Sequence, residues 1–217
     1  MAANDDLAME VHAGTRHPAT VHRGNRLGGT EGNQILTSSV AGILTVLLIA
    51  EGITILEMGG LLSVHMFIGL VLVPPVILKL SSTGYRFARY YGGARAYREK
   101  GPPALPMRLL APFLVAMTIG VFATGIWLLA LEHKSDQVLL LHKVTFIIWG
   151  VVFAIHFLVY APRALKSVRR DWGSVRNHPV PGSGLRGLLV AASLGVGAAL
   201  AISLISSISG WHGGPSG

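Results

Sequence analysis

The chain has 217 residues, of which 51% are hydrophobic and only 13% charged, and its mean hydropathy is +0.56. A soluble globular domain carries about twice that charged fraction, so the composition indicates an integral membrane protein. Cysteine is absent, which excludes disulfides, thiolate-ligated iron–sulfur clusters, thioether-attached haem and a cysteine nucleophile. The net charge of +8 lies largely beside hydrophobic segments, which makes anionic lipid headgroups rather than nucleic acid the expected counter-charge.

Residues 1–33 form a polar segment that precedes the first apolar run. It mixes acidic and basic side chains with glycines and has no helical apolar stripe, so we expect a flexible cytoplasmic tail. His12, His17 and His22 recur there at intervals of five residues, which match neither a helix face nor a common zinc spacing. We therefore interpret them as solvated histidines rather than as a metal site.

Five apolar runs have the roughly 20 residues that a membrane-spanning helix needs. They cover residues 35–56, 61–80, 109–131, 138–160 and 185–207. Arginine and lysine gather in the connections 81–108 and 161–184, and by the positive-inside rule these connections are cytoplasmic. We expect an all-α plasma-membrane protein with its N-terminus inside and its C-terminus outside. Its parts would be a four-helix bundle over residues 34–160, a basic cytoplasmic loop over 161–184, and a fifth packing helix with a short external tail over 185–217.

The fourth run contains His142 and His156, which are 14 residues apart. In a helix this spacing returns to nearly the same face, roughly 21 Å further along the axis. His65 lies about as far from the outer end of the second run as His142 does from that of the fourth, and Lys79 follows His65 at the same spacing of 14 residues. Polar side chains at such depth are costly without partners. The two helices are therefore expected to face each other with a nitrogen-bearing side chain from each at two depths.

This pattern resembles the di-haem membrane cytochromes b, in which the second and fourth helices of a bundle ligate one b-type haem near each membrane face. The resemblance covers roughly residues 35–160 and rests on His65, His142 and His156, with Lys79 where the family places a fourth histidine. It implies that His65 and His142 are the axial ligands of an outer haem iron and that His156 ligates an inner one. It also implies an electron-transfer subunit that works with quinone and with other redox subunits.

The residues themselves leave an alternative for the outer pair. His65 and His142 could be buried histidines that hydrogen-bond only to each other. A zinc site would need four suitable ligands, and the sequence offers none beyond these two at that depth.

Lys79 allows three interpretations. Its neutral amine could ligate the inner iron, which requires binding to offset deprotonation. Its ammonium could instead reach lipid phosphates or a haem propionate, leaving His156 as sole ligand or paired elsewhere. The inner haem could also be missing. Pro74 and Pro75, which lie between His65 and Lys79, can kink or rotate the lower half of that helix.

Further polar side chains lie near the two expected sites. Glu51, inside the first run near its outer end, is expected either to accept the proton released in quinol oxidation or to snorkel to the interface. Arg86 and Arg89 continue the second run into the cytoplasm, where they could contact inner-haem propionates or lipid headgroups.

Small residues and an aromatic stripe also recur within the third, fourth and fifth apolar runs. Gly120 and Gly125 could admit a flat macrocycle, although close helix packing is the commoner role of such residues. An aromatic stripe on the fourth run, formed by Phe146, Trp149 and Phe153, is expected to be packing that lines the space between two haems. The fifth run carries small residues every four positions, which predicts a packing face toward the bundle or a partner subunit. These small residues are Ala191, Gly195, Ala199 and Ser203.

The chain shows no glycine-rich dinucleotide fingerprint and no catalytic-triad candidate. The sequence therefore favours a transmembrane b-type cytochrome that passes electrons between the quinone pool and a redox partner, as the membrane anchor of an oxidoreductase complex. Two alternatives stay open: a stand-alone quinol-dependent reductase of a small acceptor, and a haem-free transporter or scaffold that uses the histidines as a proton relay.

Overall fold

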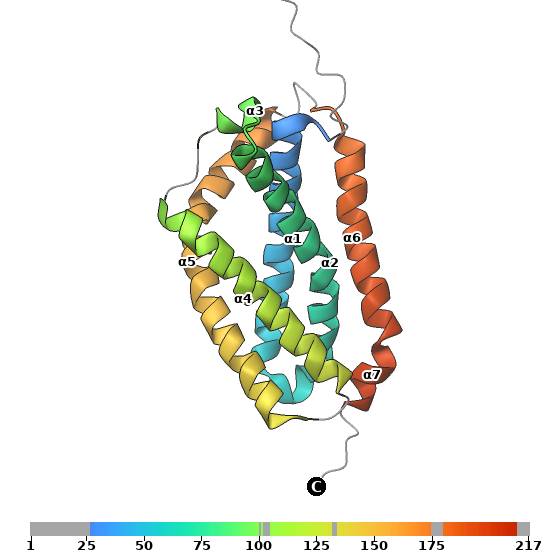
Figure 1. The fold of residues 1–217 in the computed structure, drawn as a ribbon. Coiled ribbons are helices and arrows are strands. Elements are labelled where there is room, and N and C mark those ends of the chain that lie inside the picture. The colour runs from blue at the N-terminus through green and yellow to red at the C-terminus, as the bar shows by residue number, and fades with distance from the viewer. Residues whose placement is uncertain (1–26, 100, 102–104, 132–133, 175–179, 212–217) are drawn as a thin grey trace, which may run out of the picture.

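The structure is a computed structural model that describes residues 27–99, 101, 105–131, 134–174 and 180–211, with the side chains of all these except 161–174. Throughout these ranges the secondary structure is helical (Figure 1). The helices are α1 (Gly29–Leu56), α2 (Met58–Tyr91), α3 (Arg95–Arg98), α4 (Leu105–Ala130), α5 (Asp136–Ser174), α6 (Ser183–Ser203) and α7 (Ile205–Gly210). Five helical segments are long and apolar enough to cross a membrane, namely α1, α2, α4, the first part of α5 (Asp136–Tyr160) and α6. The prediction of a helical multi-pass membrane protein is confirmed.

Several helices extend beyond the apolar runs that predicted them. α1 begins at Gly29, so the last residues of the predicted tail are helical, while residues 1–26 of that tail, with its three histidines, lie outside the described residues. α2 continues to Tyr91 and α5 to Ser174, so both predicted basic connections begin as helix. The reason is that an apolar run marks the length in contact with lipid, whereas alanine, leucine, lysine and arginine continue a helix into water.

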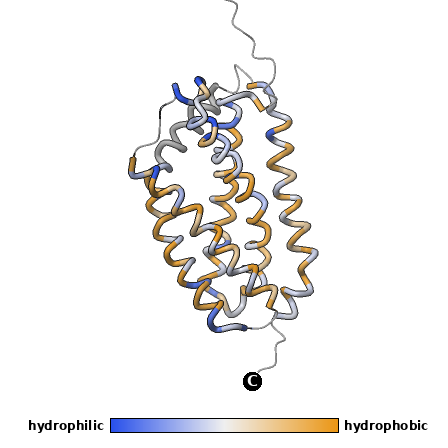
Figure 2. The backbone as a smooth tube through the Cα atoms, in the orientation of Figure 1, coloured by the Kyte–Doolittle hydropathy of each residue, from blue (hydrophilic) through white to orange (hydrophobic). Residues whose placement is uncertain are grey.

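The two ends of the bundle differ. The start of α1, the short helix α3 and the start of α6 lie at one end, and the turn from α1 to α2, the turn from α4 to α5 and helix α7 lie at the other (Figure 1). The described parts of both arginine-rich connections therefore belong to the same end. Figure 2 shows apolar residues along the middle of the long helices and hydrophilic residues mainly toward the ends.

Large apolar side chains cover the outside of the bundle. Leu56, Leu109 and Leu158 are exposed by 84%, 71% and 70%. Such side chains are too many for a water-facing surface, but they suit contact with lipid tails, where backbone groups are already satisfied within the helices.

The long helices pack as two groups. α2 lies against both α1 and α6, α4 lies against α5, and α2 also contacts α4. One buried cluster joins α1 to α2 through Leu36, Val40, Leu44 and Leu72. A second joins α2, α4, α6 and α7 through Leu70, Leu129, Ala201 and Ile208.

Helix α6 approaches α2 through small residues, but not through the stripe predicted from the sequence. Gly197 and Ala201 are buried, and a Cβ added at Gly197 would lie 2.5 Å from the carbonyl oxygen of Val71. The predicted stripe, represented by Gly195 and Ala199, is exposed on the other side of α6. The stripe is therefore not the packing face within this chain, and its use by a partner subunit stays a prediction.

Candidate functional site

The structure brings His65 of α2 and His142 of α5 together near the turns of the bundle. Their ring centroids are 6.5 Å apart, and their planes make an angle of 77°. Two metal–imidazole bonds of about 2 Å each would set the ring centres roughly 6 Å apart. The spacing of the two rings therefore fits one metal ion held between them.

A threonine of α4 defines which nitrogen of His142 is free. Thr124 Oγ1 donates its hydrogen to a backbone carbonyl of its own helix, at 2.7 Å from Gly120 O and 3.1 Å from Val121 O. The same hydroxyl lies 2.9 Å from His142 Nδ1, so it accepts a hydrogen bond from that nitrogen. His142 consequently carries its proton on Nδ1 and keeps the lone pair of Nε2.

The same argument holds for His65 with α1. Thr54 Oγ1 donates to the carbonyl oxygen of Glu51 at 2.6 Å and lies 3.0 Å from His65 Nδ1. Oε1 of Glu51 lies 3.1 Å from the same nitrogen. Because the Thr54 hydroxyl donates its own hydrogen to Glu51 O, it accepts from His65 Nδ1–H, so His65 also carries its proton on Nδ1 and leaves Nε2 as the nitrogen able to bind a metal.

This arrangement fits an axial pair of histidines. Histidines that ligate metals almost always donate their other ring N–H to a carboxylate, a carbonyl or another acceptor, which fixes tautomer and orientation. Among the described residues no three His, Cys, Asp or Glu side chains gather into one metal site. The donor set of His65 and His142 therefore suits a macrocycle that supplies the remaining ligands itself, such as haem, better than it suits zinc.

Glu51 faces the bundle rather than the membrane interface. Its side chain is only 14% exposed, Oε1 contacts His65, and Oε2 is buried without a hydrogen-bond partner in the described structure. This buried position differs from the one that the snorkelling interpretation expects, in which the carboxyl group reaches the interface. The predicted role as a proton acceptor remains untested, but the position beside His65 agrees with the expected depth.

The inner pair is arranged differently. Lys79 Nζ donates to the carbonyl oxygen of Thr37 at 2.7 Å, across the contact between α2 and α1. Next to it, Thr37 Oγ1 lies 3.1 Å from Ser82 Oγ, and Asn33 Nδ2 donates to Ser82 O at 3.1 Å. Lys79 thus belongs to a row of hydrogen-bonded polar side chains between α1 and α2.

His156 has no comparable anchor. Its ring lies 4.7 Å from that of Tyr160, and its Nδ1 is buried without a hydrogen-bond partner in the described structure. The structure therefore orients the two outer histidines through threonine hydroxyls and leaves His156 without such an acceptor.

Pro74 and Pro75 lie inside α2, which continues through both of them as one helix.

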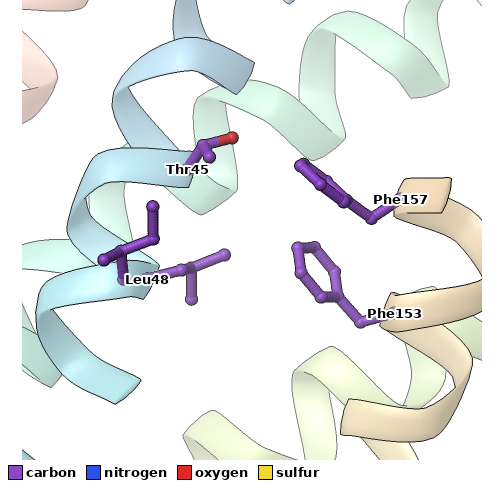
Figure 3. Close-up of a pocket in the computed structure, with 5 residues that line it drawn as sticks. Thr45, Leu48, Phe153 and Phe157 are labelled. Carbon is purple, nitrogen blue, oxygen red and sulfur yellow. The ribbon is translucent and has the colours of Figure 1, made fainter. Parts of the chain in front are cut away.

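A pocket of about 210 Å³ separates α1 from α5 on the inner side of the histidine pair. Figure 3 shows Phe153 and Phe157 facing Thr45 and Leu48 across an open space; Ile49 completes the lining. The predicted aromatic stripe forms a column of stacked rings on α5, with centroid distances of 6.0, 4.8 and 5.9 Å. The predicted members are Phe146, Trp149 and Phe153, and the structure adds Phe157 to the column.

The remaining predicted residues lie around these two regions. Arg86 is half-buried and Arg89 exposed near the basic end of α2. A Cβ added at Gly125 would lie 3.2 Å from Cε1 of His142, whereas one added at Gly120 would make an ordinary contact of 3.6 Å with Thr145. Gly125 therefore makes room for the His142 ring, and Gly120 serves the contact between α4 and α5.

Sequence reasoning missed Thr54 and Thr124. A usable signal was present for Thr124, because it and His142 lie equally far from the turn between α4 and α5. A hydroxyl at the depth of an intramembrane histidine is a candidate acceptor for it.

Comparison of the chain with protein-family models, with curated proteins and with solved structures gives no match.

Proposed function

We propose that this chain is a transmembrane b-type cytochrome that transfers electrons between the quinone pool and a redox partner, as the membrane-anchor subunit of an oxidoreductase complex. The observation that carries the proposal is the arrangement of His65 and His142. Both rings donate from Nδ1, both keep the lone pair of Nε2, and their centres are 6.5 Å apart. A pair that merely satisfied its own polar atoms would not need an outside acceptor for each Nδ1.

A haem bound there would supply an iron that accepts and releases one electron. The chain's own residues bind and orient it. α2 and α5 provide the two imidazoles, α1 and α4 hold the rings through Thr54 and Thr124, and the apolar bundle keeps water from the site.

The proposal includes a second haem on the inner side, ligated by His156. Nδ1 of His156 has no hydrogen-bond partner within the described part of the chain, which leaves this ring able to serve a ligand. Lys79 is less suited to complete the site, because its Nζ already donates to Thr37 O. Arg86 and Arg89 lie at the same end of the bundle and would contact propionates of that haem.

The proposal also includes the topology and the mobile partner. We propose that the N-terminus is inside and the C-terminus outside, in the plasma membrane; the described parts of the two basic connections lie at one end of the bundle, which the positive-inside rule would assign to the cytoplasm. Glu51, beside His65, is the candidate acceptor for the proton that accompanies quinol oxidation.

One observation favours a second function. Glu51 Oε2 is buried beside a histidine and has no hydrogen-bond partner among the described residues, an arrangement that also suits a haem-free transporter that moves protons through Glu51 and His65. Such a protein would need neither the 6.5 Å separation of the two ring centres nor the free Nε2 atoms.

A reduced-minus-oxidised absorption spectrum of the full chain, purified from a haem-producing host, separates the two functions. We expect b-type bands, with the contribution of the His65–His142 site lost in His65→Ala and in His142→Ala and kept in the matched control His156→Ala. Absence of haem bands from the wild-type chain would reject the cytochrome and favour the proton relay.

Turnover of the same preparation tests the subunit assignment. Reduced quinol and ferric iron are supplied without any other polypeptide, and we expect haem reduction without sustained reduction of the acceptor. Steady turnover would instead identify a stand-alone reductase.

A further inference from the structure

The near-perpendicular rings of His65 and His142 require a physical cause. Rotation of an imidazole about its terminal side-chain bond has a broad energy profile, so a histidine does not hold one ring plane unaided. The plane is set by the partners of its nitrogen atoms. Hydrogen bonds at Nδ1 are thus the available means of holding the angle of 77°.

Two acceptors from one helix hold His65. Thr54 Oγ1 at 3.0 Å and Glu51 Oε1 at 3.1 Å share its Nδ1–H. Thr54 is itself fixed, since it is 3% exposed and donates to Glu51 O. The direction of the N–H bond, and with it the ring plane, is defined from the side of α1.

His142 is held from the other side of the site. Its Nδ1 meets Thr124 Oγ1, which is 6% exposed and bonded to its own helix. Gly125, the residue after Thr124, leaves the space that the ring edge occupies. The two planes are therefore fixed independently, one by α1 and the other by α4.

We infer that Glu51 is a positioning residue that, together with Thr54, holds the His65 imidazole nearly perpendicular to that of His142 on the haem iron. The inference rests on the proposed function. It assigns Glu51 a role through His65, distinct from a direct part in quinol chemistry, and gives this polar side chain a partner inside the membrane.

The ligand planes have a direct spectroscopic signature. Each imidazole interacts with the iron d orbitals that lie across its plane. Crossed planes leave two of these orbitals nearly equal in energy, which gives low-spin ferric iron an electron paramagnetic resonance signal with a large maximal g value. Parallel planes separate the orbitals and give a smaller maximal g value.

The test is this signal in the ferric, full-length chain. We expect the large maximal g value in the wild type, a smaller value in Glu51→Leu at unchanged haem content, and a wild-type signal in Glu51→Gln, whose amide oxygen still accepts from Nδ1–H. Glu57→Leu is the matched control, because Glu57 is an exposed acid at the same end of the bundle. If Glu51→Leu loses haem, Thr54→Val carries the test with the same expected shift, because it removes one of the two acceptors.

Each outcome is decisive. A haem-loaded Glu51→Leu or Thr54→Val variant with the wild-type signal would overturn the inference and leave the cytochrome intact, as would Glu51→Gln changing as much as Glu51→Leu. A wild-type chain without haem would overturn the proposed function itself.

Discussion

Thr124 Oγ1 of α4 lies 2.9 Å from Nδ1 of His142 on α5. Thr54 of α1 has the same relationship to His65 of α2, at 3.0 Å. Helices α2 and α5 thus carry the two imidazoles, while α1 and α4 orient them. Each of the four helices around the site therefore supplies either a histidine or the threonine that orients it.

Thr124→Val should weaken haem binding without unfolding the chain. The substitution keeps the volume but leaves His142 Nδ1–H without an acceptor, and loss of such an outer contact typically costs about 10- to 100-fold in metal affinity. Titration of haem into the haem-free protein measures the change. Thr45→Val is the control, because the Thr45 hydroxyl donates only to Ala41 O of its own helix. Equal affinities for both variants would contradict the role of Thr124.

Gly125→Val should displace the His142 ring. A Cβ there already lies 3.2 Å from Cε1 of His142, and the added methyl groups come closer. We expect loss of haem per chain at unchanged helix content, measured by absorption and circular dichroism. Gly150→Val, on α5, adds a side chain whose Cβ meets no other described atom within 4 Å, and it should retain haem.

Lys79→Met should leave the outer haem unchanged. The ammonium of Lys79 donates to Thr37 O rather than to the outer site. The substitution removes the cost of burying an ammonium group, which offsets much of the stabilisation lost with the hydrogen bond to Thr37 O. The free energy of unfolding should therefore change by less than about 1.5 kcal/mol. Haem content, the ferric absorption spectrum and unfolding in mixed detergent micelles check this. A new ligand-field signal in the variant would show instead that the amine ligates iron.

Gly197→Ala should loosen α6 from α2. The added methyl would lie 2.5 Å from Val71 O, so one backbone must move, at a cost of roughly 1–3 kcal/mol. Gly195→Ala, on the exposed side of the same helix, should be neutral or stabilising by up to about 1 kcal/mol through helix propensity. Unfolding free energies of the two variants give the comparison. An equal loss in both would mean that another surface covers Gly195.

The sequence by itself determined the helical class, the five membrane-crossing segments and the common depth of His65 and His142. These follow from local quantities, because lipid thickness fixes the length of an apolar run and helical rise converts sequence separation into depth. The tertiary structure decided which partners meet. It turned Glu51 and Thr54 toward His65, engaged Lys79 with Thr37 and chose Gly197 over Gly195 for the contact with α2. Such choices depend on the rotation of each helix about its axis, which packing against neighbours sets and no single helix encodes.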